Sequence, residues 1–464
     1  MILFRISQPS SQFKALLQQT LPMLVGLLAI MGNQLIDNAF IGQLGEQPLA
    51  VVGYSLPVYQ LIIGLQVGIG IATTACASAA LGAGKTNYAR QLGAIVLGLG
   101  SVLVTIVCAL LWYYQETIAS LLGADSSLYP LLRSYWLPWL FSCWLGALLH
   151  LGYCICRSFG QALIPGKVMV LSSIINLILD PVLIFYLDLN LAGAAWATCI
   201  AFGVGLIVIF RSILANYFLM SPVNTQVIRK GVKAITQTTL PAMLSQFLPP
   251  LSAIFVTMII AGYGNSAIGA WGLANRLEYI LIILVLALTM ALPQMVGRLK
   301  GEKNYRDIKS LVKTALIFVV TVQCAFALLI WLSADLFVQV LTHEQGVQAI
   351  VQQYLMMVPI SYGPLGVCMI SISVCNAIGL PRTGLLISIV RLFICYLPMV
   401  WLGAELYGLT GVFIGACLGN LICGLMAWQV LSNYLNKLSS NNLELTLPAE
   451  QLGKPIAQVS GHSR

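Results

Sequence analysis

Charged side chains are scarce in this chain of 464 residues: only 8% are Asp, Glu, Lys or Arg, whereas 59% are hydrophobic. Soluble domains average about 25% charged and about 45–50% apolar residues. The shortage of charge excludes a water-soluble globular enzyme, a disordered chain and a nucleic-acid-binding protein. The net charge of +9 does not indicate a basic surface, because so few charged residues contribute to it. The composition indicates a helical membrane protein that crosses the bilayer several times.

Cysteines in polar loops are also missing. All 12 cysteines lie in apolar runs, with neither zinc-site spacing nor the pattern of an extracellular disulfide framework. We therefore predict that they are small packing residues. A complete phosphate-binding loop is lacking as well, because Gly82 to Lys85 lacks the second half of that motif. The chain therefore lacks the sequence signature of a protein that binds and uses ATP.

Long apolar runs dominate what is present. A bilayer core needs about 20 apolar residues in a helix, and twelve runs of this kind are separated by short polar segments. The predicted spans are residues 15–42, 49–81, 92–115, 131–155, 168–187, 191–215, 237–262, 267–297, 311–333, 349–377, 384–404 and 408–434. The predicted fold class is an all-α integral membrane protein.

The basic residues indicate which side of the membrane each loop faces. With the N-terminus in the cytoplasm, the inner segments hold 20 of the 23 basic residues, and Arg133 alone falls in an outer loop. Cytoplasmic loops carry an excess of Lys and Arg, so both termini are predicted to be cytoplasmic. The inner residues are Arg5, Lys14, Lys85, Arg90, Arg157, Lys167, Arg211, Arg229, Lys230, Lys233, Arg298, Lys300, Lys303, Arg306, Lys309, Lys313, Arg382, Lys437, Lys454 and Arg464.

The two halves of the chain resemble each other. Thr20-Leu21-Pro22 recurs as Thr239-Leu240-Pro241, and Gly84-x-x-Asn87-Tyr88 recurs as Gly301-x-x-Asn304-Tyr305. Because each half has six spans, the repeats are parallel, and two six-helix lobes would be related by a pseudo-two-fold axis along the membrane normal. We predict a cytoplasmic N-terminus at 1–14, an N-lobe at 15–219, a cytoplasmic inter-lobe linker at 220–236, a C-lobe at 237–436 and a cytoplasmic polar tail at 437–464.

Acidic residues inside spans are costly in a bilayer and mark functional sites. Asp37 on the first span and Asp180 on the fifth lie at similar depth, about 8–12 Å below the outer edge at ~1.5 Å per residue. Asn33 and Asn176 each precede one of them by four residues and share its helix face. Thr198 on the sixth span reaches the same depth. These side chains could converge in the N-lobe, although each Asp could instead pair locally and only hold helices together.

Two prolines accompany these residues. Pro181 follows Asp180 directly and is predicted to bend the fifth span, while Pro22 offers a similar hinge in the first. A proline frees a backbone carbonyl, and oxygen ligands without His or Cys suit a proton or a hard cation such as Na⁺. A Na⁺ site at Asp37, Asn176, Asp180 and Thr198 is one possibility on these grounds. The sequence does not decide between H⁺ and Na⁺.

Three further charges lie within spans of the C-lobe. Arg276 and Glu278 are two residues apart and face different sides of one helix, and Arg391 lies on another span. One of them could line a central cleft as a secondary polar residue, or Glu278 could form a buried ion pair with Arg391. Aromatic residues near span ends, including Trp112, Tyr113, Tyr114, Trp136 and Trp139, are predicted to form an interfacial belt.

Several of these segments resemble a known family. Twelve spans in two halves, Asp37 within LIDNAFIGQLG, Asn176 to Phe185 reading NLILDPVLIF, and LAGAAWAT ending at Thr198 resemble the multidrug and toxic compound extrusion (MATE) transporters, in particular their DinF-like prokaryotic branch. The resemblance covers Thr20 to Tyr434. It implies a plasma-membrane antiporter (the inner membrane of a bacterium) that exports organic cations or amphipathic compounds in exchange for inward H⁺ or Na⁺.

The resemblance also implies residue roles. Asp37 would be the central coupling residue, joined by Asn176, Asp180 and Thr198, and the first helix would bend at Pro22. Other branches of the family place coupling carboxylates in helices seven and ten. Here Gln246 to Gly262 and Val351 to Ile378 contain no acid, so coupling in the C-lobe is not expected and Glu278 has no assigned role.

The expected partners are small amphipathic or cationic drugs and the lipid bilayer, with no nucleic acid, no cofactor beyond the coupling ion, and a monomeric state. An alternative within the same superfamily is a flippase for a lipid or lipid-linked precursor. Flippases carry several cleft cations and extra helices, whereas only Arg276 and Arg391 qualify here. An intramembrane aspartyl protease fits worse, because neither Asp37 nor Asp180 lies in its usual Tyr-Asp or Gly-x-Gly-Asp motif. We therefore expect no enzymatic activity.

Overall fold

The structure is a computed structural model, and it describes residues 9–216, 218–219, 224–341 and 344–446. Regular structure within these ranges is helical throughout, as expected for segments that must satisfy every backbone hydrogen bond inside a bilayer. Eleven helical segments of the described part are long and apolar enough to cross a membrane. The predicted all-α membrane fold is therefore confirmed.

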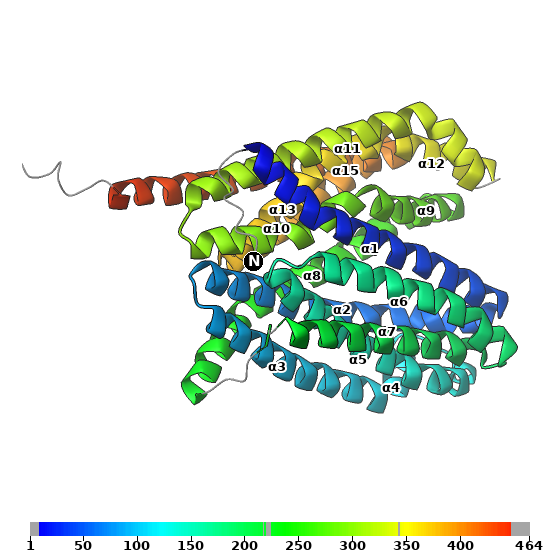
Figure 1. The fold of residues 1–464 in the computed structure, drawn as a ribbon. Coiled ribbons are helices and arrows are strands. Elements are labelled where there is room, and N and C mark those ends of the chain that lie inside the picture. Colours follow the sequence, from blue (N-terminus) through cyan, green and yellow to red (C-terminus); the bar gives the residue numbers. More distant parts are fainter. Residues whose placement is uncertain (1–8, 217, 220–223, 342–343, 447–464) are drawn as a thin grey trace, which may run out of the picture.

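The first half contains α1 to α7 (Figure 1). Its elements are α1 (Pro9–Gln43), α2 (Glu46–Gly82), α3 (Thr86–Tyr113), α4 (Gln115–Leu121), the 3₁₀ turn η1 (Ser126–Leu128), α5 (Tyr129–Ser158), α6 (Leu163–Pro181), the π-helical segment η2 (Val182–Tyr186) and α7 (Asn190–Ala215). The short helix α4 lies in a segment that the sequence predicts as an outer loop.

The second half repeats this order with more breaks. Its elements are α8 (Thr225–Ala261), α9 (Asn265–Leu281), α10 (Ile283–Gly301), α11 (Tyr305–Leu341), α12 (Gln345–Met357), the 3₁₀ turn η3 (Val358–Ser361), α13 (Tyr362–Ala377), α14 (Pro381–Ile389), the π-helical segment η4 (Val390–Tyr396) and α15 (Leu397–Thr446).

Eleven spanning segments correspond to the twelve predicted runs. The segment from Pro381 to Leu438 contains two of those runs, and non-helical torsions at Tyr407 and Gly408 mark the turn between them. The run predicted at 267–297 is not one continuous helix, because α9 ends at Leu281 and α10 begins at Ile283. The break occurs at Ile282, where there is neither a proline nor a glycine, so the residue pattern does not predict it.

Several predicted boundaries differ from the helices. α8 begins at Thr225, so residues 225–236 of the predicted linker are helical. α1 begins at Pro9 within the predicted N-terminal segment, and α15 continues into the predicted tail as far as Thr446. Residues 1–8, 220–223 and 447–464 of those predicted segments lie outside the described residues. The polar helix ends project beyond the apolar runs by which the spans were defined.

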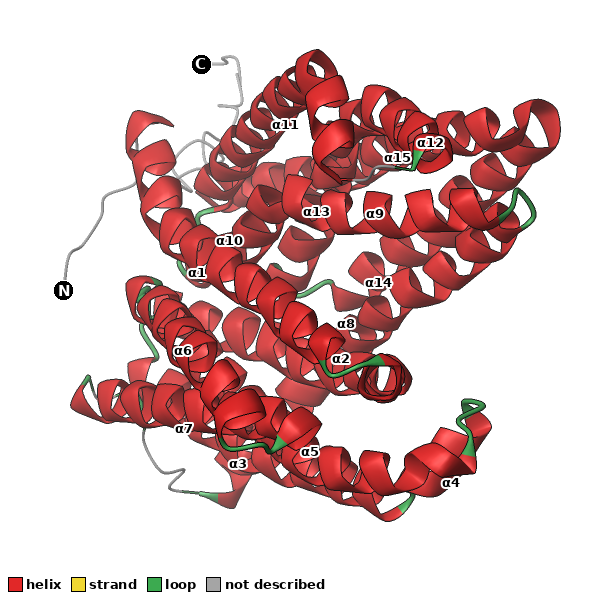
Figure 2. Cartoon of the chain, turned by 90° about the vertical axis from the view of Figure 1, so that its right-hand side faces the viewer, coloured by secondary structure: helices red, strands yellow, loops and turns green. Residues whose placement is uncertain are grey.

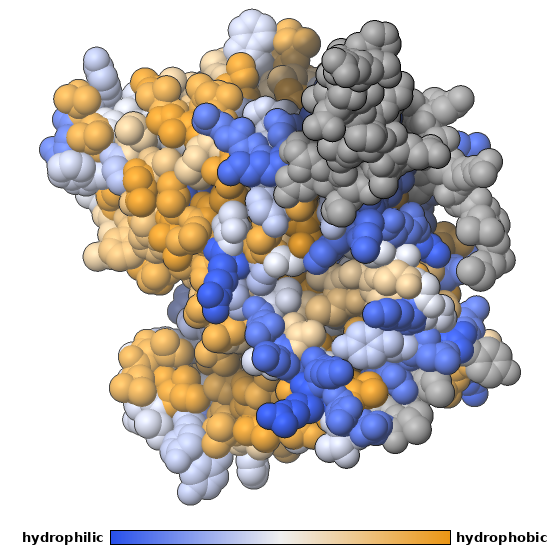
Figure 3. All heavy atoms as spheres, turned by 90° about the vertical axis from the view of Figure 1, so that its left-hand side faces the viewer, coloured by the Kyte–Doolittle hydropathy of each residue, from blue (hydrophilic) through white to orange (hydrophobic). Residues whose placement is uncertain are grey.

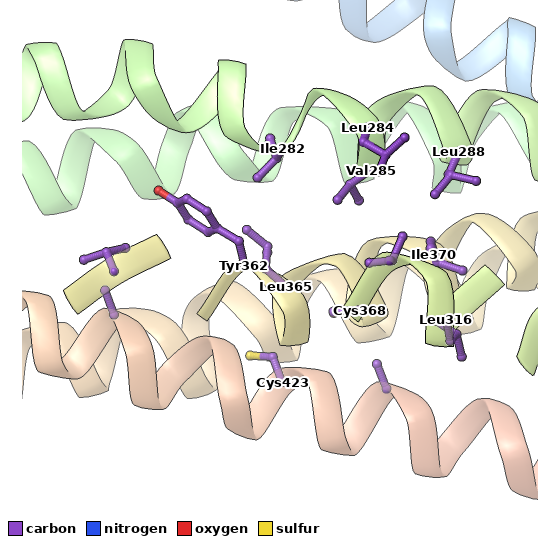
Figure 4. Close-up of a cluster of buried hydrophobic side chains, with 14 of the residues drawn as sticks. Ile282, Leu284, Val285, Leu288, Leu316, Tyr362, Leu365, Cys368, Ile370 and Cys423 are labelled. Carbon is purple, nitrogen blue, oxygen red and sulfur yellow. The ribbon is translucent and has the colours of Figure 1, made fainter. Parts of the chain in front are cut away.

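The helices pack as two groups around separate cores. One core gathers buried side chains of α2, α3, α5 and α7, and a larger one gathers those of α8 to α15. Figure 2 shows the two groups end-on, with α1, α2 and α8 near their junction. In the C-lobe core, Val285 and Leu288 of α10 face Leu365, Cys368 and Ile370 of α13 (Figure 4). This two-lobe arrangement agrees with the predicted repeat.

The start of α1 belongs structurally to the second half. Leu16 is buried in the C-lobe core, and the ring of Phe13 meets that of Phe318 edge-on at 5.3 Å. Gln12 accepts a hydrogen bond from the hydroxyl of Ser310 at 2.8 Å. The rest of α1 packs along α6, so this helix connects the two lobes. The predicted N-lobe, which begins at residue 15, assigns the whole span to the first half.

One end of the molecule carries the loops 83–85, 159–162, 302–304 and 378–380, which we call the basic end. Hydrophilic residues gather over this end, and apolar side chains border them (Figure 3). The lobes meet here through backbone contact: a Cβ on Gly82 of α2 would overlap the carbonyl oxygen of Arg298 on α10, and one on Gly301 would overlap that of Ala79. At the opposite end, α9 packs against α8, α10 and α12, which all belong to the C-lobe.

The interfacial belt is only partly as predicted. Trp112, Tyr113 and Tyr114 are exposed, as a belt requires. Trp136 is fully buried, and its indole donates a hydrogen bond to the hydroxyl of Ser55 at 2.9 Å; Trp139 is 9% exposed. The assignment of these two residues to the belt was wrong, because α5 is enclosed by α2, α3 and α7 and its aromatic residues face those helices. The cysteines form no disulfide in the described residues, and nine of the 12 are buried, in line with a packing role.

Candidate functional site

The candidate site is created where α1 runs alongside α6. Small residues allow the two helices to approach closely: a Cβ on Gly166 would overlap the backbone of Pro22, and one on Gly26 would lie 2.6 Å from the Met169 sulfur. Small residues at membrane-helix interfaces permit this approach. The register that results places Asn33 and Asp37 of α1 next to Asn176 and Asp180 of α6.

Four side chains form a continuous hydrogen-bonded chain. The amide of Asn33 donates to both carboxylate oxygens of Asp37, at 3.3 and 3.2 Å, and to the side-chain oxygen of Asn176. The amide of Asn176 in turn donates to Asp180 Oδ1 at 2.9 Å. Asn176 is 4% exposed and Asp180 is fully buried. The two acids therefore lie in one network, as the matched depths of the sequence predict.

This network is incomplete in a way that indicates its chemistry. The carboxyl groups of Asp37 and Asp180 are close enough to each other to interact electrostatically. Asp180 Oδ2 and Asn33 Oδ1 are buried without a donor among the described residues. A buried acceptor without a donor costs about 1–3 kcal/mol. A proton shared by the carboxyl groups, or a small hard cation between them, would supply the missing positive partner.

The two hinge prolines differ in their surroundings. The regular helix α6 ends at Pro181, and the chain continues as the π-helical segment η2, so the backbone changes directly after Asp180. Such π-helical segments often occur at functional sites. Pro22 lies inside α1, which continues without interruption from Pro9 to Gln43. Thr198 on α7 donates its hydroxyl to the carbonyl of Ala194 at 3.0 Å, and so does not join the hydrogen-bonded chain of the two acids.

The C-lobe charges do not form a comparable network. Arg276 is exposed, while Glu278 and Arg391 are half-buried. Glu278 and Arg391 are close enough to interact electrostatically, but the described residues show no ion pair between them within 4.0 Å. The nitrogen Nε of Arg391 is buried without a partner. The ion pair considered from the sequence is therefore not formed in this arrangement.

Sequence reasoning missed one neighbour of the site. Tyr135 on α5 is 6% exposed and lies within electrostatic range of Asp37. Its ring stacks on Trp139 at 5.9 Å. Apart from its position one turn before the buried Trp139, no signal in the sequence distinguishes Tyr135 from the other aromatic residues near span ends. Its proximity to Asp37 follows only from how α5 packs in the lobe.

Comparisons with known proteins agree with this geometry. The family model described as MatE matches residues 22–182 and again 241–402, so the same pattern occurs once in each half. The "FAD transporter" of Shewanella oneidensis is 28% identical over 423 residues, which cover 90% of this chain and 94% of the relative. The "Multidrug export protein MepA" of Staphylococcus saprophyticus is 24% identical and covers 94% of this chain and 97% of its own length.

Solved structures show the same arrangement of helices. The Vibrio cholerae MATE transporter VcmN in its bent form is 44% identical, with a TM-score of 0.90, over 93% of this chain and 98% of that one. A MOP superfamily transporter from Pyrococcus furiosus is 22% identical with a TM-score of 0.86, which shows a shared fold. The chain therefore belongs to the MatE family of membrane transporters.

Proposed function

We propose that this protein is a secondary active efflux antiporter that exports organic cations or other amphipathic compounds in exchange for inward H⁺ or Na⁺. The observation that carries the proposal is the hydrogen-bonded chain of Asp37, Asn33, Asn176 and Asp180, which is half-buried at Asp37 and Asn33, buried at Asn176 and Asp180, and leaves two buried oxygens without donors. Coupling then takes place in the N-lobe, and the protein catalyses no covalent step. The basic end faces the cytoplasm in this proposal, because that end collects most Lys and Arg residues.

Alternating access requires that the two lobes separate at one end while they close at the other. The described structure is closed at the basic end by α2 and α10. Release of substrate toward the opposite end, followed by binding of the coupling ion at Asp37 and Asp180, would complete one half of the cycle. An ion can shift such an equilibrium only through its different affinity for the two arrangements.

The proposal is tested by efflux in inverted membrane vesicles, with a pH gradient and a Na⁺ gradient imposed separately. Accumulation of a fluorescent organic cation driven by one gradient would support it. FAD serves as a second test substrate, since a relative of 28% identity is named an FAD transporter. Accumulation driven only by ATP, or by neither gradient with any substrate, would contradict the antiport mechanism. Uptake of a labelled lipid-linked precursor alone would favour the flippase alternative.

The orientation leads to a prediction about accessibility. In a cysteine-free variant in intact cells, an impermeant thiol reagent should label single cysteines placed between 116 and 127, at the opposite end. Cysteines between 85 and 90 or between 300 and 309, at the basic end, should react only after permeabilisation. The reason is the excess of basic residues on the cytoplasmic side. The reverse labelling pattern would show that the orientation is wrong.

Variants of the fifth and sixth predicted spans should distinguish the coupling ions. If the site holds Na⁺ and the Thr198 hydroxyl turns toward it, Asp180→Asn and Thr198→Ala should both raise the Na⁺ concentration for half-maximal efflux, because the first removes the carboxylate charge and the second removes a hydroxyl oxygen. If it handles a proton, both should instead shift the pH at which efflux begins, with little Na⁺ dependence. Efflux would be measured at fixed substrate concentration across both titrations. A variant pair that leaves both titrations unchanged would remove these residues from the coupling site.

A further inference from the structure

A cavity of about 290 Å³ lies at the basic end, on the boundary between the lobes. Alanines of α2 form much of its wall, and Lys85 and Tyr88 contribute from the turn into α3. The C-lobe contributes Thr238 of α8, Lys300 of α10 and Asn376 of α13. A second hollow, lined by Gly84 to Tyr88, adjoins it through their shared residues. The cavity borders the end of α2 at Gly82, whereas Asp37 lies near the other end of that helix, close to the turn from α1 into α2. The cavity is therefore separate from the hydrogen-bonded network of the two acids.

The cations at this cavity lack anionic partners. Lys300 is half-buried, and its ammonium would lie 2.6 Å from a Cβ on Gly379, so the side chain reaches across to the loop before α14. Neither Lys300 nor Lys85 forms an ion pair in the part of the chain that the structure describes. Just over one turn into α3, outside the cavity lining, Arg90 has its nitrogen Nε buried without a partner among the described residues. The two positive charges of Lys85 and Lys300 therefore line this cavity, and neither has a carboxylate partner among the described residues.

The start of α3 adds unsatisfied hydrogen-bond donors. No side chain caps this helix of 28 residues, whose N-cap position is Lys85. The backbone N–H groups of the first turn point out of a helix end and carry partial positive charge, which makes such ends binding sites for phosphate groups. A lysine at the N-cap is unfavourable there unless an anion is bound.

The internal repeat provides a comparison within the same molecule. The corresponding turn before α11 holds Glu302 and Asp307 where the first half has Lys85 and Arg90, each 217 residues apart. There the Asn304 side chain accepts a hydrogen bond from the Asp307 N–H at 3.2 Å and donates to its carboxylate at 2.6 Å. Glu302 lies 3.9 Å from Arg298. The second half thus supplies its own negative charge at this helix start, whereas the first half has positive charge in both places.

We propose that the cavity binds a phosphate-bearing anion between Lys85, the first turn of α3 and Lys300. The phosphate accepts charge-assisted hydrogen bonds from both ammonium groups and from the free backbone N–H groups of α3. The alanine-lined wall accommodates the apolar part of the molecule that carries the phosphate. Because Lys85 belongs to one lobe and Lys300 to the other, the bound anion stabilises the arrangement that is closed at the basic end.

Two sources share this chemistry: the head group of a membrane lipid and a free phosphate compound. Thermal unfolding of the purified full-length protein would be followed with added dihexanoyl phosphatidate, dihexanoyl phosphatidylcholine or inorganic phosphate at constant ionic strength. We expect a saturable rise of the unfolding midpoint with phosphatidate and none with phosphatidylcholine, whose phosphate carries a bulky cationic substituent. An equal rise with inorganic phosphate would assign the site to free phosphate compounds; a rise with phosphatidate alone would assign it to lipids.

Variants make the test specific to the cavity. Lys85→Gln with Lys300→Gln should weaken the apparent affinity by about tenfold or more, since hydrogen bonds to charged groups contribute about 1.5–3 kcal/mol each. Lys300→Arg, which keeps the charge, should retain most of it. Lys230→Gln, an exposed lysine of α8 at the same end, is the matched control and should bind normally. No stabilisation of the unaltered protein by any phosphate compound, or equal losses in the Lys230→Gln control, would overturn the proposal.

Discussion

Replacing Asp37 by asparagine should abolish ion-coupled efflux while leaving folding and membrane insertion intact. The amide has nearly the same shape as the carboxylate and can still accept the hydrogen bond that Asn33 donates. Through Asn33, position 37 stays connected to Asn176 and Asp180. It cannot take up or release a proton, and it is a weaker ligand for Na⁺ because it has no charge. Coupling free energies of about 1–3 kcal/mol correspond to about 5–150-fold effects, so we expect a loss of at least about tenfold in gradient-driven efflux.

The measurement is initial efflux rate in inverted vesicles that contain equal amounts of folded protein, judged by thermal unfolding. Glu405→Gln is the matched control, because it changes an exposed carboxylate of α15 at the opposite end in the same way. Normal efflux of Asp37→Asn under either ion gradient would show that coupling takes place elsewhere. Glu278 on α9 would then be the next acid to examine, since it is half-buried in the other lobe.

The second large effect is expected from Gly82→Ala at the boundary between the lobes. A methyl group on Gly82 would overlap the carbonyl oxygen of Arg298 on α10, which is backbone and cannot rotate away. Overpacking of this kind costs about 1–3 kcal/mol, and here the penalty falls only on the arrangement in which the lobes touch at the basic end. The equilibrium should shift away from that arrangement by about tenfold, since about 1.4 kcal/mol corresponds to that factor.

This shift can be measured as the rate at which a thiol reagent modifies Thr238→Cys in a cysteine-free variant, because Thr238 lines the cavity at the boundary and is 8% exposed. Gly82→Ala should accelerate the modification and lower efflux. Gly98→Ala on α3 is the control, since a Cβ there meets nothing within 4 Å. If Gly82→Ala left the rate of thiol modification unchanged, α2 and α10 would be able to move apart slightly without shifting the equilibrium between the two lobe arrangements.

Much of the architecture follows from the sequence because the bilayer restricts the choices. Twelve apolar runs, the basic loops between them and the repeated Thr-Leu-Pro and Gly-x-x-Asn-Tyr segments indicate two parallel halves of membrane helices. The pairing of Asp37 with Asn33, and of Asp180 with Asn176, is local to one helix face and can be predicted from spacing alone. That these residues belong to one depth in the bilayer follows from counting residues along each helix.

Other features depend on packing, which spacing does not encode. The sequence places Thr198 at the depth of the site, but in the structure its hydroxyl donates to the carbonyl of Ala194 within α7. The burial of Trp136 and the contact of Leu16 with the C-lobe core arise from neighbouring helices, and the break at Ile282 occurs without a proline or glycine. None of them leaves a periodic or compositional signal in its own segment.

A two-lobed helical membrane protein with carboxylates in its N-lobe can be inferred from the amino-acid order, because hydrophobic length and charge are properties of each segment alone. The hydrogen bond from Asn33 to Asn176, which connects the two acids into one network, depends instead on how α1 and α6 pack together. Packing likewise brings Lys85 and Lys300, 215 residues apart, to one cavity. Both results depend on how closely helices approach, which is set by glycines such as Gly166 and Gly82 acting together with their partners on other helices.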